Sequence, residues 1–246
     1  MTPALETRGL SIAFGGLKAV DAVSFSATRN KITTVIGPNG AGKTTLFNLI
    51  SGGLRPASGT VMLDGRNVTG FGPAALQGSG LARSFQITNL FFELTVRENL
   101  GLAAQTLDPV INAFFPVGRR GRAADKVDEL IERFGFAAKA HELVAALSHG
   151  EQRRLEIAMC LASEPQILML DEPTQGMSHG DTEETARLIR SLSTEVTVLL
   201  IEHDIGLVMS LSDHVVVMHQ GRKLSEGAPA EVRSDPAVQA AYFGHG

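Results

Sequence analysis

The sequence holds a single cysteine, Cys160, among its 246 residues, so no disulfide can form within the chain. A lone thiol in an apolar stretch fits a reducing compartment and packing in the protein interior. Positive charge is also scarce, because 22 Lys and Arg face 26 Asp and Glu, which gives a formal net charge of -4. No overall positive field exists to attract a phosphate backbone, so we expect no nucleic-acid partner.

Long hydrophobic runs are absent as well. The strongest runs are all far shorter than the ~20 residues that cross a bilayer; they are Ile167–Leu170, Val196–Ile201 and Val215–Met218. The first residues, Met1 to Arg8, lack the basic start and apolar core of a secretory signal. We therefore expect a cytoplasmic protein with no transmembrane segment or signal peptide, whose role at a membrane could only be peripheral.

The distribution of apolar residues indicates an α/β protein. Residues alternate as in β-strands through Leu5–Ala27, around the turn Phe14-Gly15-Gly16, and buried strands alternate with helices from Ile167 onward. Strands separated by helices predict a mainly parallel sheet with helices on its faces. Between these parts the pattern is helical. We predict one domain over 1–246, with a core formed by 1–94 and 164–246 and an inserted helical subdomain at about 95–163.

Periodicity and turn signals place the individual elements. The expected strands are Ile32–Ile36, Val61–Leu63, Arg83–Gln86, Ile167–Asp171, Val196–Ile201, Val215–Met218 and Lys223–Ser225. The expected helices are one that follows Gly37–Thr45 and runs to about Ser51, then Glu151–Ala162, Thr182–Leu192 and Ile205–Leu211.

The segment from Gly37 to Thr44 reads G-P-N-G-A-G-K-T and matches the P-loop pattern G-x-x-x-x-G-K-[ST] between an apolar strand and a helix. The glycines let successive backbone N–H groups point at phosphates, and the helix N-terminus adds positive potential. Lys43 is predicted to reach the β- and γ-phosphates, and Thr44 to give its hydroxyl to Mg²⁺. The predicted nucleotide-binding residues are Gly37, Pro38, Asn39, Gly40, Ala41, Gly42, Lys43, Thr44 and Thr45.

A P-loop is shared by kinases, GTPases, helicases and other ATPases, so the motifs downstream have to discriminate among them. The sequence has no N-K-x-D motif for reading guanine, but the apolar run Ile167–Leu170 leads into Asp171 and Glu172. This pattern predicts a buried strand that delivers two carboxylates to the end of the sheet. Asp171 would hold Mg²⁺, directly or through water, and Glu172 would polarise the attacking water.

The segment from Leu147 to Arg154, L-S-H-G-E-Q-R-R, closely resembles the L-S-G-G-Q signature of ABC ATPases. With the P-loop and the acidic strand in the usual order, the resemblance covers nearly the whole chain. It implies the ABC ATPase fold, with an N-terminal antiparallel β subdomain, and the ATP-hydrolysing role of an ABC transporter subunit. Ser148 and Gly150 would begin a helix, where a hydroxyl and unpaired N–H groups can hold a phosphate.

Three further positions gain a role from this resemblance. Gln86 looks like the Q-loop glutamine, which contacts Mg²⁺ and the attacking water and senses the membrane partner; a surface glutamine is the alternative. His203 looks like the switch histidine that contacts the γ-phosphate, against an ordinary histidine at a strand end. Phe14 resembles the A-loop aromatic that stacks on adenine, against a core residue. The implied catalytic residues are Lys43, Gln86, Glu172 and His203, and the implied Mg²⁺ ligands are Thr44, Gln86 and Asp171.

Other segments of the sequence indicate which subfamily of ABC ATPases the chain resembles. Several segments resemble ATP-binding subunits of branched-chain amino acid importers: L-S-H-G-E-Q-R followed by Leu155-Glu156-Ile157-Ala158, Phe14-Gly15-Gly16, Arg83-Ser84-Phe85-Gln86 and the closing Ala240-Ala241-Tyr242-Phe243-Gly244. Subunits for urea, amides or aromatic acids share much of this pattern. The sequence departs from the common family pattern at His149, Glu151 and Ser178. Ser178 replaces the usual D-loop aspartate, which leaves contacts across a dimer at that point open.

The resemblance also implies partners. ATP and Mg²⁺ would be the cofactors, and ATP would lie between the P-loop of one subunit and the signature of a second ATPase subunit, either identical or paralogous. Membrane-spanning permease subunits would dock near Gln86 and Asn89–Phe92, at the cytoplasmic face of the cell membrane, with core packing as the alternative for Phe91 and Phe92. A complete importer would include an extracytoplasmic solute-binding protein. A soluble ABC ATPase acting on DNA or the ribosome, and a non-catalytic nucleotide-binding module, remain alternatives.

Overall fold

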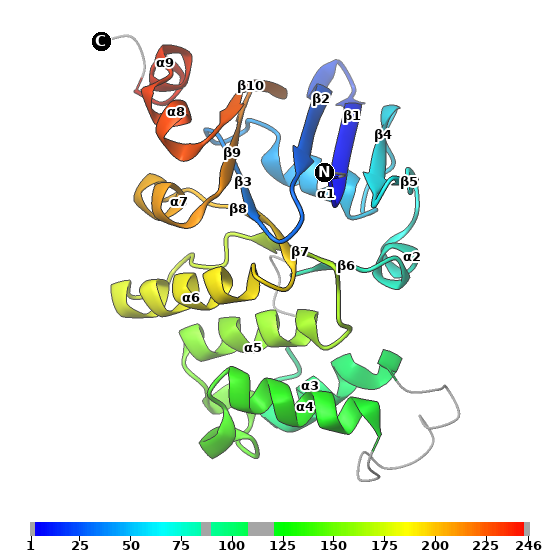
Figure 1. Ribbon diagram of the computed structural model, residues 1–246, viewed down its shortest axis with the longest axis vertical. Coiled ribbons are helices and arrows are strands. Elements are labelled where there is room, and N and C mark those ends of the chain that lie inside the picture. The colour runs from blue at the N-terminus through cyan, green and yellow to red at the C-terminus, as the bar shows by residue number, and fades with distance from the viewer. Residues whose placement is uncertain (1–2, 85–89, 108–120, 244–246) are drawn as a thin grey trace.

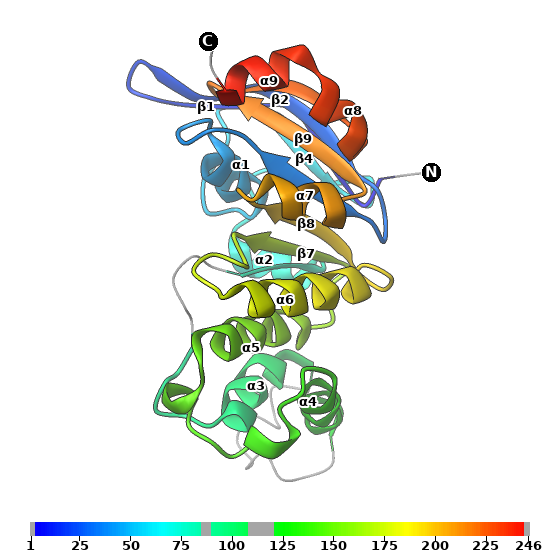
Figure 2. The ribbon, with the colours of Figure 1, turned by 90° about the vertical axis from the view of Figure 1, so that its left-hand side faces the viewer.

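The computed structural model describes residues 3–84, 90–107 and 121–243. Figures 1 and 2 show a molecule whose strands gather in one part, while α3, α4 and α5 form the other part along the same long axis. These described residues form two sheets. The predicted α/β class, with a mainly parallel sheet and an antiparallel N-terminal sheet, is confirmed.

The antiparallel sheet has four strands in the order β2-β1-β4-β5. β1 and β2 form a hairpin in which Leu5 pairs with Ala27 and Phe14 pairs with Leu17, so the chain turns at Gly15 and Gly16 as the sequence predicts. The strands are β1 (Leu5–Phe14), β2 (Leu17–Ala27), β4 (Ser58–Leu63) and β5 (Arg66–Asn67).

The larger sheet has six strands in the order β10-β9-β3-β8-β7-β6, all parallel except for the antiparallel pair β9 and β10. Every residue of β3, β7 and β8 is buried, because helices or the second sheet cover both faces. The strands are β3 (Ile32–Ile36), β6 (Leu81–Arg83), β7 (Ile167–Asp171), β8 (Thr197–Ile201), β9 (His214–His219) and β10 (Arg222–Gly227).

The helices divide between the two faces of the larger sheet. Leu46 and Phe47 of α1 pack between the antiparallel sheet and one face, whereas Leu155 of α5 and Ile189 of α6 belong to the core on the other face. The helices are α1 (Lys43–Ile50), α2 (Pro73–Gly78), α3 (Val96–Ala104), α4 (Arg122–Arg133), α5 (His149–Leu161), α6 (His179–Leu192), α7 (Ile205–Leu211), α8 (Pro229–Ser234) and α9 (Pro236–Phe243), with short 3₁₀ turns η1 (Gln105–Leu107), η3 (Ala137–Lys139) and η4 (Val144–Ala146).

Most element predictions agree with the structure to within a few residues, and the differences have local causes. α6 begins at His179 rather than at Thr182, because the Ser178 hydroxyl caps the helix by accepting the Asp181 N–H at 3.3 Å. The strand predicted at Arg83–Gln86 is β6 (Leu81–Arg83), and Gln86 itself lies outside the described residues. The short helix α2 and the two C-terminal helices were not predicted. Within the described parts of the chain, we find no helix long and apolar enough to cross a membrane.

Candidate active site

The P-loop curls between β3 and α1 and needs glycine at two positions. Gly42 has φ +97°, and a Cβ atom there would lie 2.3 Å from the carbonyl oxygen of Ala19 in β2. A Cβ atom on Gly37 would lie 2.2 Å from the carbonyl oxygen of Met218 in β9. Both glycines therefore let the loop pack directly against backbone of neighbouring strands. The loop is further held where Gly221 N–H donates to the Ala41 carbonyl at 3.0 Å.

Lys43, the first residue of α1, folds over this loop. Its amine donates to the carbonyl oxygens of Gly37 at 2.8 Å and Pro38 at 3.2 Å, and the residue is only 6% exposed. Burial lowers the pKa of Lys43, and the negative charges of Glu172 and Asp171 act in the opposite direction. The Lys43 amine therefore lies in the electrostatic field of two carboxylates, those of Asp171 at the end of β7 and of Glu172 directly after it.

The start of α1 is suited to an anion. Gly42 is its N-cap and contributes no side chain, and the first turn has no acidic residue. The first N–H groups of a helix have no partner within the helix and carry partial positive charge. Thr44 and Thr45 lie in this first turn, next to Lys43. The arrangement of these groups therefore suits a phosphate, as the sequence predicts.

Asp171 ends β7 and is fully buried. Its Oδ2 accepts a hydrogen bond from the Arg83 guanidinium at 3.2 Å, whereas its Oδ1 has no hydrogen-bond partner in the part of the chain that the structure describes. Burial raises the pKa of Asp171, and the Arg83 charge counteracts that shift. Asp171 is therefore a buried carboxyl with one oxygen held and the other available to a ligand.

Glu172 follows Asp171 and meets His203. Its backbone is left-handed, with φ +49°, which is uncommon for a residue other than glycine and concentrates at functional sites. β7 and β8 are parallel neighbours in which Asp171 pairs with Ile201, so the residues that follow the two strands lie side by side. The result is a contact of 2.5 Å between Glu172 Oε1 and His203 Nε2.

The other predicted site residues lie in two places, on the β1–β2 hairpin and at the start of α5. Phe14 lies at the tip of the β1–β2 hairpin and is 51% exposed, so the core alternative for it is wrong. Ser148 caps α5 by accepting the Glu151 N–H, and Gly150 is buried in the first turn of that helix. Figures 1 and 2 place α1 among the strands and the whole of α5 away from it along the long axis. The structure does not bring the signature of this chain to its own P-loop.

Two arginines for which the sequence predicted no role at the site contact β7 or the residue that follows it. Arg83 donates to Asn48 and Ser51 at 2.7 Å as well as to Asp171. Arg153, in α5, donates to the carbonyl oxygens of Asp171 at 2.6 Å and Glu172 at 3.2 Å. An arginine inside an otherwise apolar strand is the one sequence signal that could have identified Arg83, since such a charge has to be paired when buried.

Glu202 is a third residue that sequence reasoning missed. It is 4% exposed, and its Oε1 accepts from the Thr174 N–H at 3.2 Å and the Thr174 hydroxyl at 2.6 Å. Its Oε2 accepts from the His203 N–H at 3.1 Å. Glu202 therefore ties the turn after β7 to the segment that carries His203. In the sequence, Glu202 lies between an apolar strand and the candidate histidine His203, and this position is the signal that could have identified it.

The comparisons with known proteins agree on one family. Residues 20–175 match the family model described as ABC transporter, and residues 222–246 match that of branched-chain amino acid ATP-binding cassette transporters. The chain is 42% identical to the high-affinity branched-chain amino acid transport ATP-binding protein BraF of Pseudomonas aeruginosa and 41% identical to LivG of Escherichia coli, with 98% of each chain covered.

Solved structures give the same fold. A nucleotide-free ATP-binding cassette from an ABC transporter superposes with a TM-score of 0.87 at 30% identity, over 99% of this chain and 100% of the other. An ATP-binding cassette in its ADP conformation also has a TM-score of 0.87 at 30% identity and covers 100% of both chains. The predicted ATP-binding cassette is thus matched along its full length.

Proposed function

Since this chain belongs to the ABC transporter family as an ATP-binding, ATP-hydrolysing subunit, we propose that it powers the import of branched-chain or related amino acids. BraF and LivG, which match nearly the whole chain, are ATP-binding proteins of branched-chain amino acid transport. The separate match of residues 222–246 to the branched-chain subfamily supports the same solute class. Urea, amides and aromatic acids are the alternatives to test.

The observation that carries the catalytic proposal is the convergence of Lys43, Asp171, Glu172 and His203 at one edge of the sheet. Lys43 and the first turn of α1 would hold the phosphates of ATP, and Phe14, exposed on its hairpin, is free to stack on adenine. Glu172 would take a proton from the attacking water, and His203 would orient that carboxylate through their contact. Gln86, which is also a proposed catalytic residue, lies outside the described residues.

Mg²⁺ fits this site as the cofactor of ATP. Asp171 Oδ1, which is buried and has no partner among the described residues, is a hard oxygen ligand, and the Thr44 hydroxyl lies in the first turn of α1. Among the described residues, no three His, Cys, Asp or Glu side chains form a cluster that could hold a metal by themselves. This composition suits Mg²⁺, which is usually bound by one or two carboxylates together with waters and substrate phosphates. When bound, the ion would neutralise charge on the β- and γ-phosphates.

A second ATPase subunit would complete the site. The start of α5, with Ser148 and Gly150, lies apart from the P-loop of the same chain (Figures 1 and 2). We therefore propose a head-to-tail dimer in which Ser148 and Gly150 of one subunit face the phosphates held by the other, with an identical or a paralogous partner. The Ser148 hydroxyl and the N–H groups of the first turn of α5 supply the chemistry for this contact.

The permease subunits that this family requires need a docking surface, and the exposed aromatic pair Phe91 and Phe92 provides a candidate. These side chains are 54% and 39% exposed, and Leu143, paired with Thr95 in the adjacent segment, is 48% exposed. Large apolar side chains that gather on a surface mark interaction sites. We propose that this chain sits peripherally at the cytoplasmic face of the membrane, in a system that includes a solute-binding protein.

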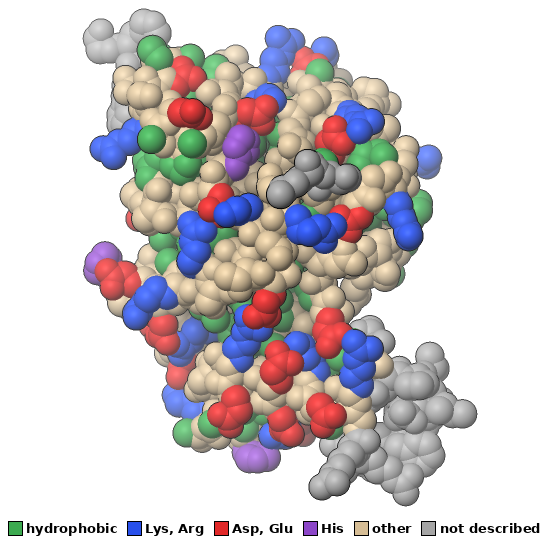
Figure 3. Space-filling model, viewed as in Figure 1, with side chains coloured by type: hydrophobic (Ala, Val, Ile, Leu, Met, Phe, Trp, Pro, Cys, Tyr) green, Lys and Arg blue, Asp and Glu red, His purple; other side chains and the backbone are tan. Residues whose placement is uncertain are grey.

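The charge distribution favours transport over a role on nucleic acid. Figure 3 shows Lys and Arg interspersed with Asp and Glu on the face drawn, rather than gathered into one basic surface. A protein that binds DNA or the ribosome through phosphates needs a concentrated positive surface.

Co-purification of a tagged chain from its native membranes tests the proposal. We expect two multispanning permease proteins and an ATPase partner, and ATPase activity of the reconstituted complex that rises with Leu, Ile or Val in the presence of the solute-binding protein. Stimulation by urea, amides or aromatic acids alone would show that the transported solute belongs to one of these classes and is not a branched-chain amino acid. Recovery of ribosomes or DNA-repair proteins in place of permeases would overturn the transport proposal.

A further inference from the structure

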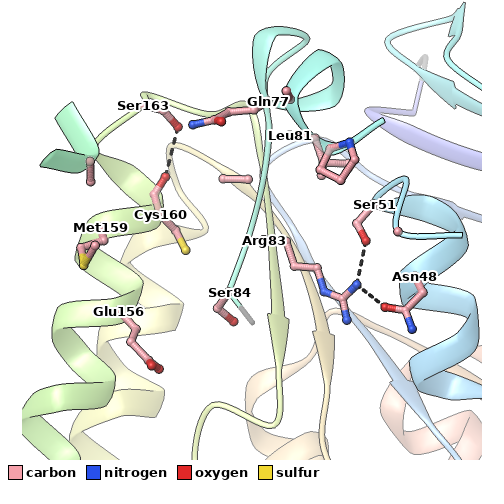
Figure 4. Close-up of a pocket in the computed structure, with 15 residues that line it drawn as sticks. Asn48, Ser51, Gln77, Leu81, Arg83, Ser84, Glu156, Met159, Cys160 and Ser163 are labelled. Atoms are coloured by element: carbon pink, nitrogen blue, oxygen red, sulfur yellow. Dashed lines mark hydrogen bonds between the residues drawn. The ribbon is translucent and has the colours of Figure 1, made fainter. Parts of the chain in front are cut away.

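The P-loop and α1 are held by other parts of the chain at both ends. At the far end of α1, the Arg83 guanidinium on β6 donates to Asn48 and Ser51 at 2.7 Å (Figure 4). At the loop end, contacts come from β2 and from the segment that follows β9, which contains β10, α8 and α9. Residues 222–246 match the branched-chain subfamily model, yet no residue of this C-terminal segment belongs to the proposed ATP site.

The turn between β9 and β10 makes one contact with the loop. Its Gly221 N–H donates to the Ala41 carbonyl at 3.0 Å, and the Gly221 carbonyl accepts from the Asp21 N–H of β2 at 2.8 Å. The Asp21 carboxylate also accepts from Nε of Arg222, the first residue of β10, at 2.8 Å. Gly221 has φ +79°, and a Cβ atom there would lie 2.7 Å from the carbonyl oxygen of Lys18. The turn is therefore fitted closely between β2 and the P-loop.

α9, which lies beside β10 (Figure 1), makes a second contact at the start of the loop. Tyr242 of α9 packs against an apolar cluster that includes Ile36, the last residue of β3, and Val217 of β9. Ile36 directly precedes Gly37, where the P-loop begins. Burial raises the pKa of Tyr242 to about 12, and a hydrogen bond with the Gly37 backbone opposes that shift. A hydrogen bond lowers the pKa of a phenol when the phenol oxygen accepts it, so the Gly37 N–H is the donor.

The conformation of Gly37 explains why contacts from outside the loop matter there. Gly37 has φ +154°, a backbone conformation that residues with a side chain rarely adopt. Glycine has more conformational freedom than any other residue, so no side chain of its own fixes the start of the loop. Hydrogen bonds at Gly37 and at Ala41 restrict the loop to the shape seen here. A nucleotide that binds an already ordered loop loses less affinity to ordering it.

We propose that the C-terminal segment from Gly221 to Tyr242 braces the P-loop in its phosphate-binding shape, and that Tyr242 is a positioning residue that raises the affinity for ATP and ADP through its hydrogen bond with Gly37. This inference rests on the proposed role of the P-loop in holding the phosphates. Tyr242 and Gly221 act through the loop backbone, and neither has to touch the nucleotide. The segment that matches the branched-chain subfamily would thus act inside the subunit, on its nucleotide site.

Tyr242→Phe tests the hydrogen bond, because it removes the hydroxyl and keeps the ring. A loop that holds its binding shape for only part of the time has a weaker apparent affinity. We expect the Kd for ADP, from calorimetric titration of the full chain, and the KM for ATP to rise roughly two- to tenfold, as the loss of one hydrogen bond predicts. At saturating ATP, kcat should stay within about twofold, because Glu172 and His203 are untouched. Without nucleotide, deuterium exchange of the peptide that contains Gly37 should be faster.

Two controls separate this role from general packing. Val232→Ala removes buried apolar atoms from the same cluster but leaves the Tyr242 hydroxyl, so it should lower the free energy of unfolding and change the Kd for ADP less than Tyr242→Phe does. Gly221→Ala is compared with Gly65→Ala, because Gly65 has φ +77° but no atom within 4 Å of a Cβ. Only Gly221→Ala should weaken ADP binding.

The outcomes separate the inference from the site on which it rests. If Tyr242→Phe changes neither the Kd for ADP nor deuterium exchange, or if Val232→Ala weakens binding equally, Tyr242 is not a positioning residue. Equal Kd values for Gly221→Ala and Gly65→Ala would show that the β9–β10 turn does not brace the loop. Lys43→Ala tests the nucleotide site itself and should weaken ADP binding strongly. If Lys43→Ala binds ADP as the unmodified chain does, the proposed nucleotide site fails first.

Discussion

Asp171 and Glu202 are buried carboxylates near the ends of neighbouring strands, and their partners assign them different tasks. Both oxygens of Glu202 accept hydrogen bonds, from Thr174 and from the His203 N–H, so Glu202 holds two segments in place. Asp171 keeps Oδ1 without a partner among the described residues. A buried carboxylate whose two oxygens both accept hydrogen bonds holds its neighbours in place. A buried carboxylate with an oxygen that accepts none can bind a ligand. We therefore infer that Glu202 is a positioning residue, and Asp171 remains the proposed metal ligand.

Glu172→Gln separates ATP binding from hydrolysis. The amide retains an oxygen close to His203 but cannot take a proton from water, so we expect turnover to fall by roughly 10²–10⁴-fold. Equilibrium binding of ATP should change little, because the residues proposed to hold the phosphates are untouched. Steady-state ATPase assays and nucleotide titration measure the two quantities. Unchanged turnover would remove Glu172 from the catalytic assignment.

Glu202→Ala should reduce both stability and turnover. The change leaves three donors, the Thr174 N–H, the Thr174 hydroxyl and the His203 N–H, without their buried acceptor. We expect the free energy of unfolding to fall by about 1–3 kcal/mol, with a lower kcat from a misplaced His203. Glu202→Gln, which keeps one acceptor oxygen, is the conservative comparison. Denaturant titration and ATPase kinetics of both variants should show the smaller effect for Gln.

At the scale of elements, the P-loop and the capped helices show how local chemistry fixes an element's start. α5 and α3 each begin with a capping box, Ser148 with Glu151 and Thr95 with Glu98. Ser178, which replaces the usual D-loop aspartate, caps α6. The departure at Ser178 therefore preserves a helix start.

The P-loop glycines offer a matched pair of substitutions. Gly42→Ala combines φ +97° with a Cβ atom 2.3 Å from the Ala19 carbonyl oxygen, so we expect a loss of roughly 2–4 kcal/mol in stability, weaker ATP binding, or both. Gly40→Ala has φ +78° but no atom within 4 Å of the new Cβ, so only the backbone penalty of about 1–2 kcal/mol applies. Thermal unfolding and nucleotide titration compare them. Equal effects would show that the contact with Ala19 is unimportant.

At the scale of the whole molecule, the two functional surfaces lie in different parts. The P-loop lies among the strands, and the signature helix α5 lies toward the helical part (Figures 1 and 2). In the proposed head-to-tail dimer, a single chain would therefore present one half of each of two composite sites. The exposed aromatic pair Phe91 and Phe92 adds a third surface, for which we propose the permease as partner.

Phe91→Glu should weaken assembly without unfolding the subunit. Phe91 is 54% exposed, so a charged side chain there should change the free energy of unfolding by no more than about 0.5 kcal/mol. Permease recovery in co-purification should fall, because a carboxylate would be buried at the interface. Phe71→Glu, at a residue 44% exposed near α2, serves as the control. Equal permease recovery with both variants would remove Phe91 from the docking surface.

The sequence by itself determined the strands, most of the long helices and the motif residues, because these depend on local periodicity and on backbone chemistry within a few residues. The P-loop is the clearest case, since its glycines, Lys43 and the following helix are contiguous. Only the tertiary structure decided which distant groups meet. Arg83 and Asp171 are 88 residues apart in the chain, and Arg153 of α5 reaches the carbonyl oxygen of Asp171 at the end of β7. Such pairings depend on packing and burial, which a linear pattern does not contain.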